Sequence, residues 1–113
     1  MKNEVRPIVI KDEENGKEYT LEFNRESIAF SETKGFDIND IEKKPMTRIP
    51  ELFYYAFRMH HRNVSREKTD AILDTIGWNE KLLTRLGELY AAPFNTLLAG
   101  DDEPKNPKMT VEF

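Results

Sequence analysis

Residues 46–61 (MTRIPELFYYAFRMHH) constrain the fold more than any other stretch of the chain. Hydrophobic side chains recur there at the i, i+3 and i+4 spacing of a helix, so one face can pack into a core. The residues of this stripe are Ile49, Leu52, Phe53, Ala56, Phe57 and His60. Tyr54, Tyr55 and Met59 fall outside it, and the sequence leaves open whether they pack on a second buried face or contact a partner protein. We therefore predict a helix over 46–61, with partner-binding residues Phe53, Tyr54, Tyr55, Phe57, Arg58 and Met59.

Length and charge narrow the classes of protein to which the chain can belong. A chain of 113 residues can build one core and not two, so we expect one domain over 1–98. The polar residues 99–113 are predicted to form a linker, with 109–113 alternating as a strand does. A net charge of -4 disfavours nucleic acid as a partner, because phosphates favour a basic surface.

The composition also excludes several kinds of site and location. The chain contains no cysteine, which removes disulfides, thiolate nucleophiles and cysteine-ligated zinc. Its first residues lack the apolar core of a signal peptide, and no run of residues is long and apolar enough for a membrane helix. We therefore expect the protein in the cytoplasm, with no membrane partner.

The N-terminal residues 5–23 are predicted to form a β-hairpin. Asn15-Gly16 is the strongest short-range hairpin signal, because both residues tolerate the positive φ of a two-residue turn. Such a turn pairs Asp12 with Tyr19, and further out it pairs Ile10 with Leu21 and Ile8 with Phe23, which places the apolar side chains on one face.

Capping residues predict the remaining helices. Asn24, Ser65 and Asn79 each precede a helical pattern, and Asp37 precedes a single helical turn. Thr47 is the expected cap of the aromatic helix, the short link over 62–64 implies that the next helix runs antiparallel to it, and Pro93 is expected to kink or break the last helix. The predicted fold is therefore α+β, an N-terminal hairpin with 109–113 as a candidate third strand, packed on three or four helices.

No residue pattern indicates catalysis, a cofactor or a metal. His60 and His61 are adjacent, so on a helix they point about 100° apart, whereas helical zinc pairs need i, i+4 spacing. The carboxylates lack an apolar setting that would raise a pKa for acid or base chemistry, and the serines lack a nucleophile motif. We therefore predict a protein that is not an enzyme.

Basic residues gather beside the aromatic segment. Arg48, Arg58, Arg62 and Arg66 lie there with few acidic neighbours. They form either a solvated rim or a binding surface, and the interleaved aromatics are also typical of single-strand nucleic-acid binders.

Residues 17–61 resemble small phage and prophage tail assembly chaperones. The motifs follow one another in order: Tyr-Thr-Leu-Glu-Phe at 19–23, Asn-Arg-Glu-Ser at 24–27, Gly-Phe-Asp-Ile at 35–38, and Lys-Pro-Met-Thr at 44–47 before an aromatic helix that ends in histidine. The helices up to residue 98 are compatible with this resemblance. It implies a protein that binds the tape-measure protein, and also tail tube subunits, in the host cytoplasm and is absent from the mature virion. Self-association and a frameshifted longer form are further features that such chaperones show.

The sequence is also compatible with two other functions. The first is a structural virion component, such as a tail completion or connector protein, and the second is a small nucleic-acid-binding regulator that uses the arginine group. The family offers no catalytic motif to carry over, so the six partner-binding residues rest on the helical pattern alone.

Overall fold

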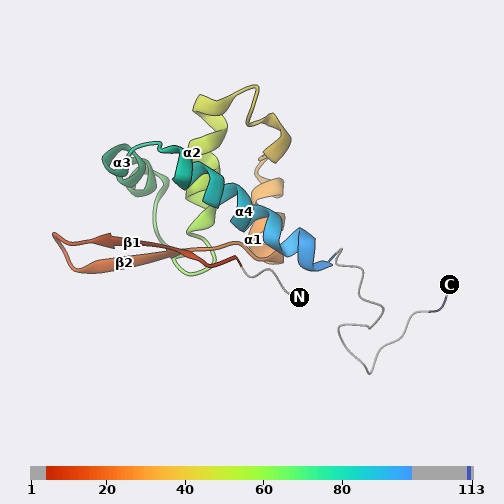
Figure 1. Ribbon diagram of the computed structural model, residues 1–113, viewed down its shortest axis with the longest axis horizontal. Helices are drawn as coiled ribbons and strands as arrows, with labels where there is room; N and C mark the ends of the chain where they lie inside the picture. The colour runs from red at the N-terminus through yellow and green to blue at the C-terminus, as the bar shows by residue number, and fades with distance from the viewer. Residues whose placement is uncertain (1–4, 98–111, 113) are drawn as a thin grey trace.

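A computed structural model of the chain describes residues 5–97 and 112. A β-hairpin is followed by four α-helices and one 3₁₀ turn (Figure 1). In chain order these elements are β1 (Ile8–Asp12), β2 (Lys17–Leu21), α1 (Arg25–Thr33), η1 (Ile38–Asp40), α2 (Pro45–Ala56), α3 (Arg66–Ile76) and α4 (Glu80–Leu97). The predicted α+β fold, with its N-terminal hairpin, is confirmed. The predicted domain end at 98 and the strand over 109–113 lie outside the described residues, apart from Glu112.

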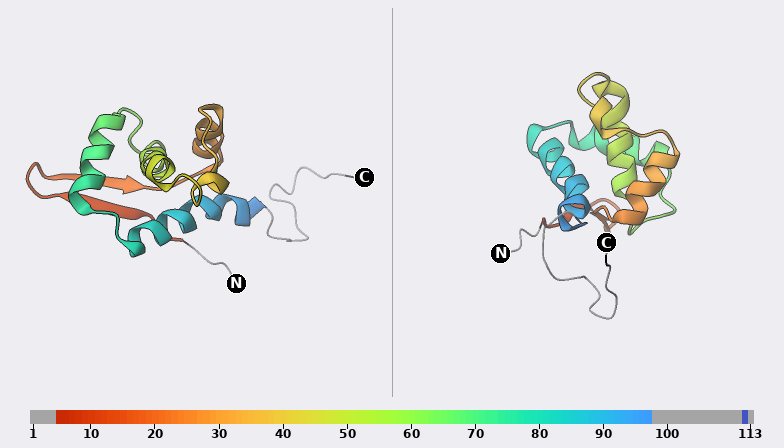
Figure 2. Two further views of the ribbon diagram at one scale, coloured as in Figure 1. Left: turned by 90° about the horizontal axis from the view of Figure 1, so that it is seen from above. Right: turned by 90° about the vertical axis from the view of Figure 1, so that its right-hand side faces the viewer.

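The helix α2 occupies the centre of the fold. It contacts α1, α3, α4 and η1, which surround it in Figures 1 and 2. Five of the six residues of its predicted stripe are buried, with Phe53 1% exposed and Ala56 fully covered, whereas the sixth, His60, lies beyond the helix and is exposed. The hydrophobic core is continuous from this stripe to Leu21 of the hairpin and to Leu86 of α4. Burying one large apolar side chain stabilises a fold by about 1.5–3 kcal/mol, so this helix organises the core.

The hairpin forms with a register two residues away from the predicted one. Ile8 pairs with Leu21, Ile10 with Tyr19, and Asp12 with Lys17, so residues 13–16 form the loop instead of Asn15-Gly16 alone. The Asp12 carbonyl accepts a hydrogen bond from the Gly16 N–H at 2.9 Å, and Gly16 has a φ of 71°. Because strand side chains alternate with period two, this shift keeps the same apolar residues on the core face. The predicted pairs are wrong, whereas the predicted face is right.

Both ends of α1 follow from local sequence. The Asn24 side chain accepts from the Ser27 N–H at 2.7 Å, and the Ser27 hydroxyl accepts from the Asn24 N–H at 2.9 Å. At the other end the Phe36 N–H donates to the Ser31 carbonyl at 3.0 Å, and Gly35 has a φ of 88°. This pattern is a Schellman motif, whose left-handed residue is usually glycine. The chain is thereby turned so that Phe36 packs into the core.

Asn24→Ala is expected to lower the free energy of unfolding by about 1 kcal/mol, because it removes one of the two reciprocal capping bonds. Urea unfolding followed by circular dichroism measures this loss. Asn63→Ala is the matched control, since Asn63 is exposed in a turn, and it is expected to change stability by less than about 0.5 kcal/mol. Equal losses in the two variants would show that the cap is not stabilising.

The helix α2 differs from its prediction at both ends. It begins at Pro45 after Lys44, so Thr47 is not its cap, and Pro50 lies inside the helix. It ends at Ala56 and not near His61. Proline at the first helical position is favourable because its missing N–H would be unpaired there in any case. The early end has a tertiary cause: the Glu22 N–H donates to the Ala56 carbonyl at 3.0 Å and so ties the end of the helix to the chain just beyond β2.

The helix α3 matches its predicted ends, but it does not run antiparallel to α2. Ser65 caps it by accepting from the Lys68 N–H at 3.1 Å, and Gly77 follows its last residue. In Figure 1 α3 is seen nearly end-on, whereas α2 lies in the plane of the picture, so the axes of the two helices cross at a steep angle. Because α2 ends at Ala56, residues 57–65 form the link, which is longer than the predicted one and permits this crossing.

The helix α4 continues through Pro93 as far as Leu97, and the predicted break does not occur. Asn79 caps it as predicted, accepting from the Leu82 N–H at 2.7 Å. A proline removes one hydrogen bond to the carbonyl four residues earlier, here that of Leu89. With the proline so close to its end, the helix loses little. In the part of the chain that the structure describes, no helix combines the length and apolar character needed to cross a bilayer.

Candidate protein-binding site

Two long-range contacts attach the turn after α2, residues 57–62, to β2 and to the residue just beyond it. The Thr20 N–H donates to Nε2 of His61 at 2.8 Å, and the His60 ring lies 2.8 Å from the Glu22 carboxylate. An N–H donor facing Nε2 requires that nitrogen to carry no proton, so His61 is neutral. These contacts fix residues 57–62 between the hairpin and α1.

The two histidines therefore serve different partners and do not converge on a metal. Their ring centroids lie 6.4 Å apart. Burial, together with the charge of neighbouring His60, lowers the pKa of His61 below its usual value. Among residues 5–97 and 112, no three His, Asp or Glu side chains are grouped so as to hold a metal ion.

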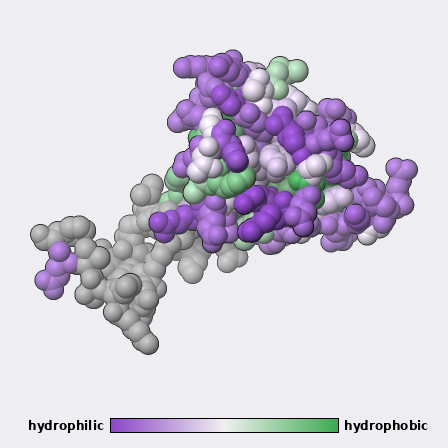
Figure 3. All heavy atoms as spheres, turned by 180° about the vertical axis from the view of Figure 1, so that it is seen from behind, coloured by the Kyte–Doolittle hydropathy of each residue, from purple (hydrophilic) through white to green (hydrophobic). Residues whose placement is uncertain are grey.

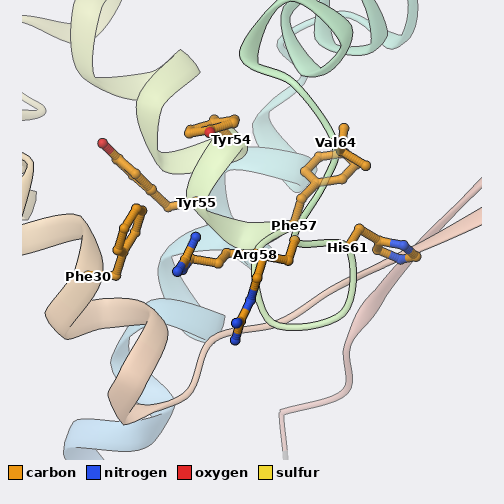
Figure 4. Close-up of a pocket in the computed structure, with 8 residues that line it drawn as sticks. Phe30, Tyr54, Tyr55, Phe57, Arg58, His61 and Val64 are labelled. Carbon is orange, nitrogen blue, oxygen red and sulfur yellow. The ribbon is translucent and has the colours of Figure 1, made fainter.

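Aromatic rings fill the space between α1 and the end of α2. Tyr55 is 8% exposed and makes edge contacts with Phe30 at 6.1 Å and with Phe36 at 5.8 Å between ring centroids. Burial raises the pKa of Tyr55, which stays protonated at neutral pH. Figure 4 shows Tyr55 and Phe30 side by side, with Arg58 reaching toward Phe30 from the turn after α2. Phe30 is the member of this cluster that lines the candidate site, and Tyr55 supports it from behind.

Arg58 stacks on the Phe30 ring. Its guanidinium carbon lies 3.4 Å from the centroid of the Phe30 ring, and the Lys34 ammonium lies 5.4 Å from the same centroid. A stacked guanidinium keeps its N–H donors free at its edges, so the ring orients Arg58 without occupying its hydrogen-bonding groups.

An open groove of about 390 Å³ runs between α1 and the turn after α2. We name it the Arg58 groove, and the side chains that define it are Glu26, Phe30, Thr33, Arg58, Met59 and Arg62. Its walls combine apolar and cationic groups, which is a composition suited to a mixed polar and apolar ligand.

The six predicted partner-binding residues divide into two groups. Phe53, Phe57 and Tyr55 are buried in the core, at 1%, 1% and 8% exposure. Tyr54 and Arg58 are half-buried, and Met59 is 39% exposed. The second face of the aromatic segment is therefore partly core and partly surface.

The predicted arginine group also divides. Arg48 pairs with Asp40 at 2.9 Å and with Glu51 at 2.8 Å, and the hydrogen bond from Arg48 lowers the pKa of Asp40. Arg66 pairs with Asp70 on α3 at 2.9 Å. Arg58 and Arg62 are the two members that line the Arg58 groove.

The predictions missed the contribution of α1. Phe30 lies next to Ile28 and Ala29 in a helix with no clean apolar stripe, so its sequence gave no sign that it would support Arg58.

Exposed apolar side chains are scattered over the molecule, and one of them, Met59, lies in the groove. The exposed large hydrophobic side chains of the described residues are Val9, Met46, Met59, Ile76 and Phe94, which come from separate elements. The face drawn in Figure 3 is mostly hydrophilic, with hydrophobic residues showing only in small areas. A broad apolar patch of the kind that marks large interfaces is therefore not present on that face.

The buried hydroxyl groups have local structural partners. Ser31 donates to the Ile28 carbonyl at 2.6 Å, and Thr69 donates to the Arg66 carbonyl at 3.0 Å. In the described residues every buried side-chain nitrogen or oxygen has a hydrogen-bond partner. These bonds satisfy the buried hydroxyl groups, and neither hydroxyl is paired with a general base that would activate it as a nucleophile.

Comparisons with known proteins give a family without a known activity. No curated protein and no solved structure matches the chain. The match to one family covers the whole chain, residues 1–113, so the protein belongs to DUF5055, which is described as a domain of unknown function.

Proposed function

We propose that this protein works by binding another protein, and that it acts as a chaperone of phage tail assembly. The observation that carries the binding proposal is the Arg58 groove, where Phe30 orients a half-buried arginine beside exposed Met59. Aromatic, arginine and methionine side chains together are typical of interface centres. The ordered motifs over residues 17–61 support the tail assembly role.

The proposed partner is the tape-measure protein, together with tail tube subunits. The resemblance implies that the protein binds a long helical tape-measure protein while the tail is built, through adaptable apolar surface. A small domain with one mixed groove covers such a partner in many copies, each bound weakly enough to be released. The protein would act in the host cytoplasm and leave the tail before the virion is complete.

Co-expression tests the proposal directly. The full chain is expressed with the tape-measure protein encoded in the same genome, and the soluble fraction and co-purification of the two chains are measured. We expect more soluble tape-measure protein and a complex that survives gel filtration. No complex together with no gain in solubility would contradict the proposal.

Mass spectrometry of purified virions separates a chaperone from a structural component. We expect peptides of tube and tape-measure proteins and none of this protein, because a chaperone is released before the tail matures. Stoichiometric recovery of this protein from virions would instead place it in the particle as a connector or completion subunit.

A further inference from the structure

We infer that the Arg58 groove recognises a carboxylate-bearing side chain next to an apolar one, on a peptide segment of the partner. The inference deepens the proposed function and rests on its claim that the groove binds a protein. It names the chemistry of the bound segment: Asp or Glu facing the two arginines, with an apolar neighbour against Phe30 and Met59.

The first observation concerns the contacts of the Arg58 guanidinium. Its guanidinium carbon lies over the Phe30 ring at 3.4 Å from the centroid, and the guanidinium forms no hydrogen bond or ion pair with any residue that the structure describes. The ring has already restricted the side chain, so less conformational entropy is lost when a ligand binds. A carboxylate is the group that fits the two parallel N–H donors of a guanidinium edge.

The second observation is how the arginines are paired. Arg48, Arg66 and Arg85 each have a carboxylate within 3.5 Å, whereas Arg6 and Arg25, which do not line the groove, have none among the described residues. Arg58 and Arg62, which line the groove together, have none within residues 5–97 and 112. A chain with a net charge of -4 therefore leaves two neighbouring guanidiniums unpaired at one open groove.

The surrounding charges keep the groove positive. One carboxylate, that of Glu26, and two guanidiniums, those of Arg58 and Arg62, line the groove. The Lys34 ammonium adds a further positive charge, 5.4 Å from the Phe30 centroid. An acidic segment is attracted by this local field even though the whole chain is acidic.

The wall of the groove favours a peptide over a nucleic acid. Single-strand binders need an open aromatic face on which a base can stack. The Phe30 ring already carries Arg58, and Met59 offers a flexible apolar contact for an aliphatic side chain.

The test uses the full chain and a fluorescent amphipathic peptide with Glu on one face and Leu on the other. Two probes accompany it: the same peptide with Gln in place of Glu, and a labelled single-stranded oligothymidine. Fluorescence anisotropy at low salt gives the dissociation constants. We expect the Glu peptide to bind at least about tenfold more tightly than the Gln peptide, and its affinity to fall as salt is added.

The variants locate the binding. Arg58→Gln combined with Arg62→Gln is expected to weaken binding of the Glu peptide by about tenfold or more and to leave the Gln peptide unchanged. Arg58→Lys should lose most of the Arg58 contribution, because lysine keeps the charge but not the flat stacked fork. Arg66→Gln is the matched control, since Arg66 is exposed on α3 outside the groove, and it should bind as the wild type does.

The outcomes separate this inference from the proposed function. Equal binding of the Glu and Gln peptides, or tighter binding of oligothymidine, would overturn the inference. So would a tape-measure complex that the double variant leaves intact, although the chaperone proposal would then stand. Glu-peptide binding lost in the double variant supports the inference, even where the tape-measure protein itself fails to bind.

Discussion

Phe57→Ala is expected to lower the free energy of unfolding by about 3–5 kcal/mol. Phe57 is 1% exposed, and its ring lies 5.6 Å from that of Tyr19 and 5.1 Å from that of Phe53, between centroids. Removing it leaves a cavity where the hairpin meets α2, at the start of the turn that carries Arg58. Such a loss is a large part of the total stability of about 5–15 kcal/mol that a domain has.

Urea unfolding measures the stability of Phe57→Ala and Met59→Ala, which truncate a buried and an exposed side chain only two residues apart. Met59 is 39% exposed, so its truncation should change stability by less than about 0.5 kcal/mol. Phe57→Leu keeps part of the buried surface and should fall between the two. A loss below about 1 kcal/mol in Phe57→Ala would contradict the burial of its ring.

His61→Ala is expected to destabilise the protein by about 2 kcal/mol at neutral pH. It leaves the Thr20 N–H at the hairpin edge without its acceptor and removes ring contacts with Tyr19 and Phe57 at 5.4 and 6.3 Å. The hairpin has only two strands in the described chain, so this bond is one of few that join it to the helices.

The same contact makes stability depend on pH. Because the folded pKa of His61 lies below its unfolded value, the unfolded chain binds more protons as the pH falls through about 6.5 and below. His61 therefore stabilises the fold fully above that pH and progressively less below it. The groups facing the ring are Tyr19, Phe57, His60 and the Thr20 amide.

His61→Gln isolates this effect, since glutamine offers a neutral acceptor at every pH. Between about pH 7.5 and about pH 5, the wild type should lose more stability than His61→Gln does, because only the wild type has this imidazole to protonate on unfolding. His60→Gln is the comparison: it removes the contact with Glu22 and the smaller of the two causes that lower the pKa of His61, so it should reduce the loss on acidification less than His61→Gln does. An equal loss in wild type and His61→Gln would contradict the assignment.

The sequence was sufficient where structure depends on near neighbours. Asn24, Ser65 and Asn79 cap the helices that they were predicted to cap, because each bonds an amide three residues away. The apolar face of the hairpin was also predictable, because alternation survives a shift of two residues.

Contacts between distant residues decided what the sequence could not predict. The end of α2 is set by Ala56 and His61 bonding to Glu22 and Thr20, far away in the chain. A helical pattern that continues through residue 61 carries no sign of those bonds.

Some residues of the candidate site could likewise be predicted from local sequence, and others depend on contacts between distant elements. Arg58 and Met59 could be picked from residues 46–61 because they lie outside the apolar stripe. That Phe30 of α1 would support Arg58 depends on how α1 packs against α2, which no local pattern encodes. The sequence showed that four arginines lie near one another, but not which of them form ion pairs, because the pairs of Arg48 with Asp40 and Glu51 depend on the folded structure.

The most direct test of the Arg58 groove as the partner site compares two methionines with one substitution. Met59→Ser and Met46→Ser remove the same side chain, but Met59 lines the groove, whereas Met46 is 77% exposed at the opposite end of α2. The dissociation constant of the complex with the tape-measure protein should rise about tenfold in Met59→Ser and less than about twofold in Met46→Ser. Equal affinities in the two variants, or a loss confined to Met46→Ser, would contradict the account.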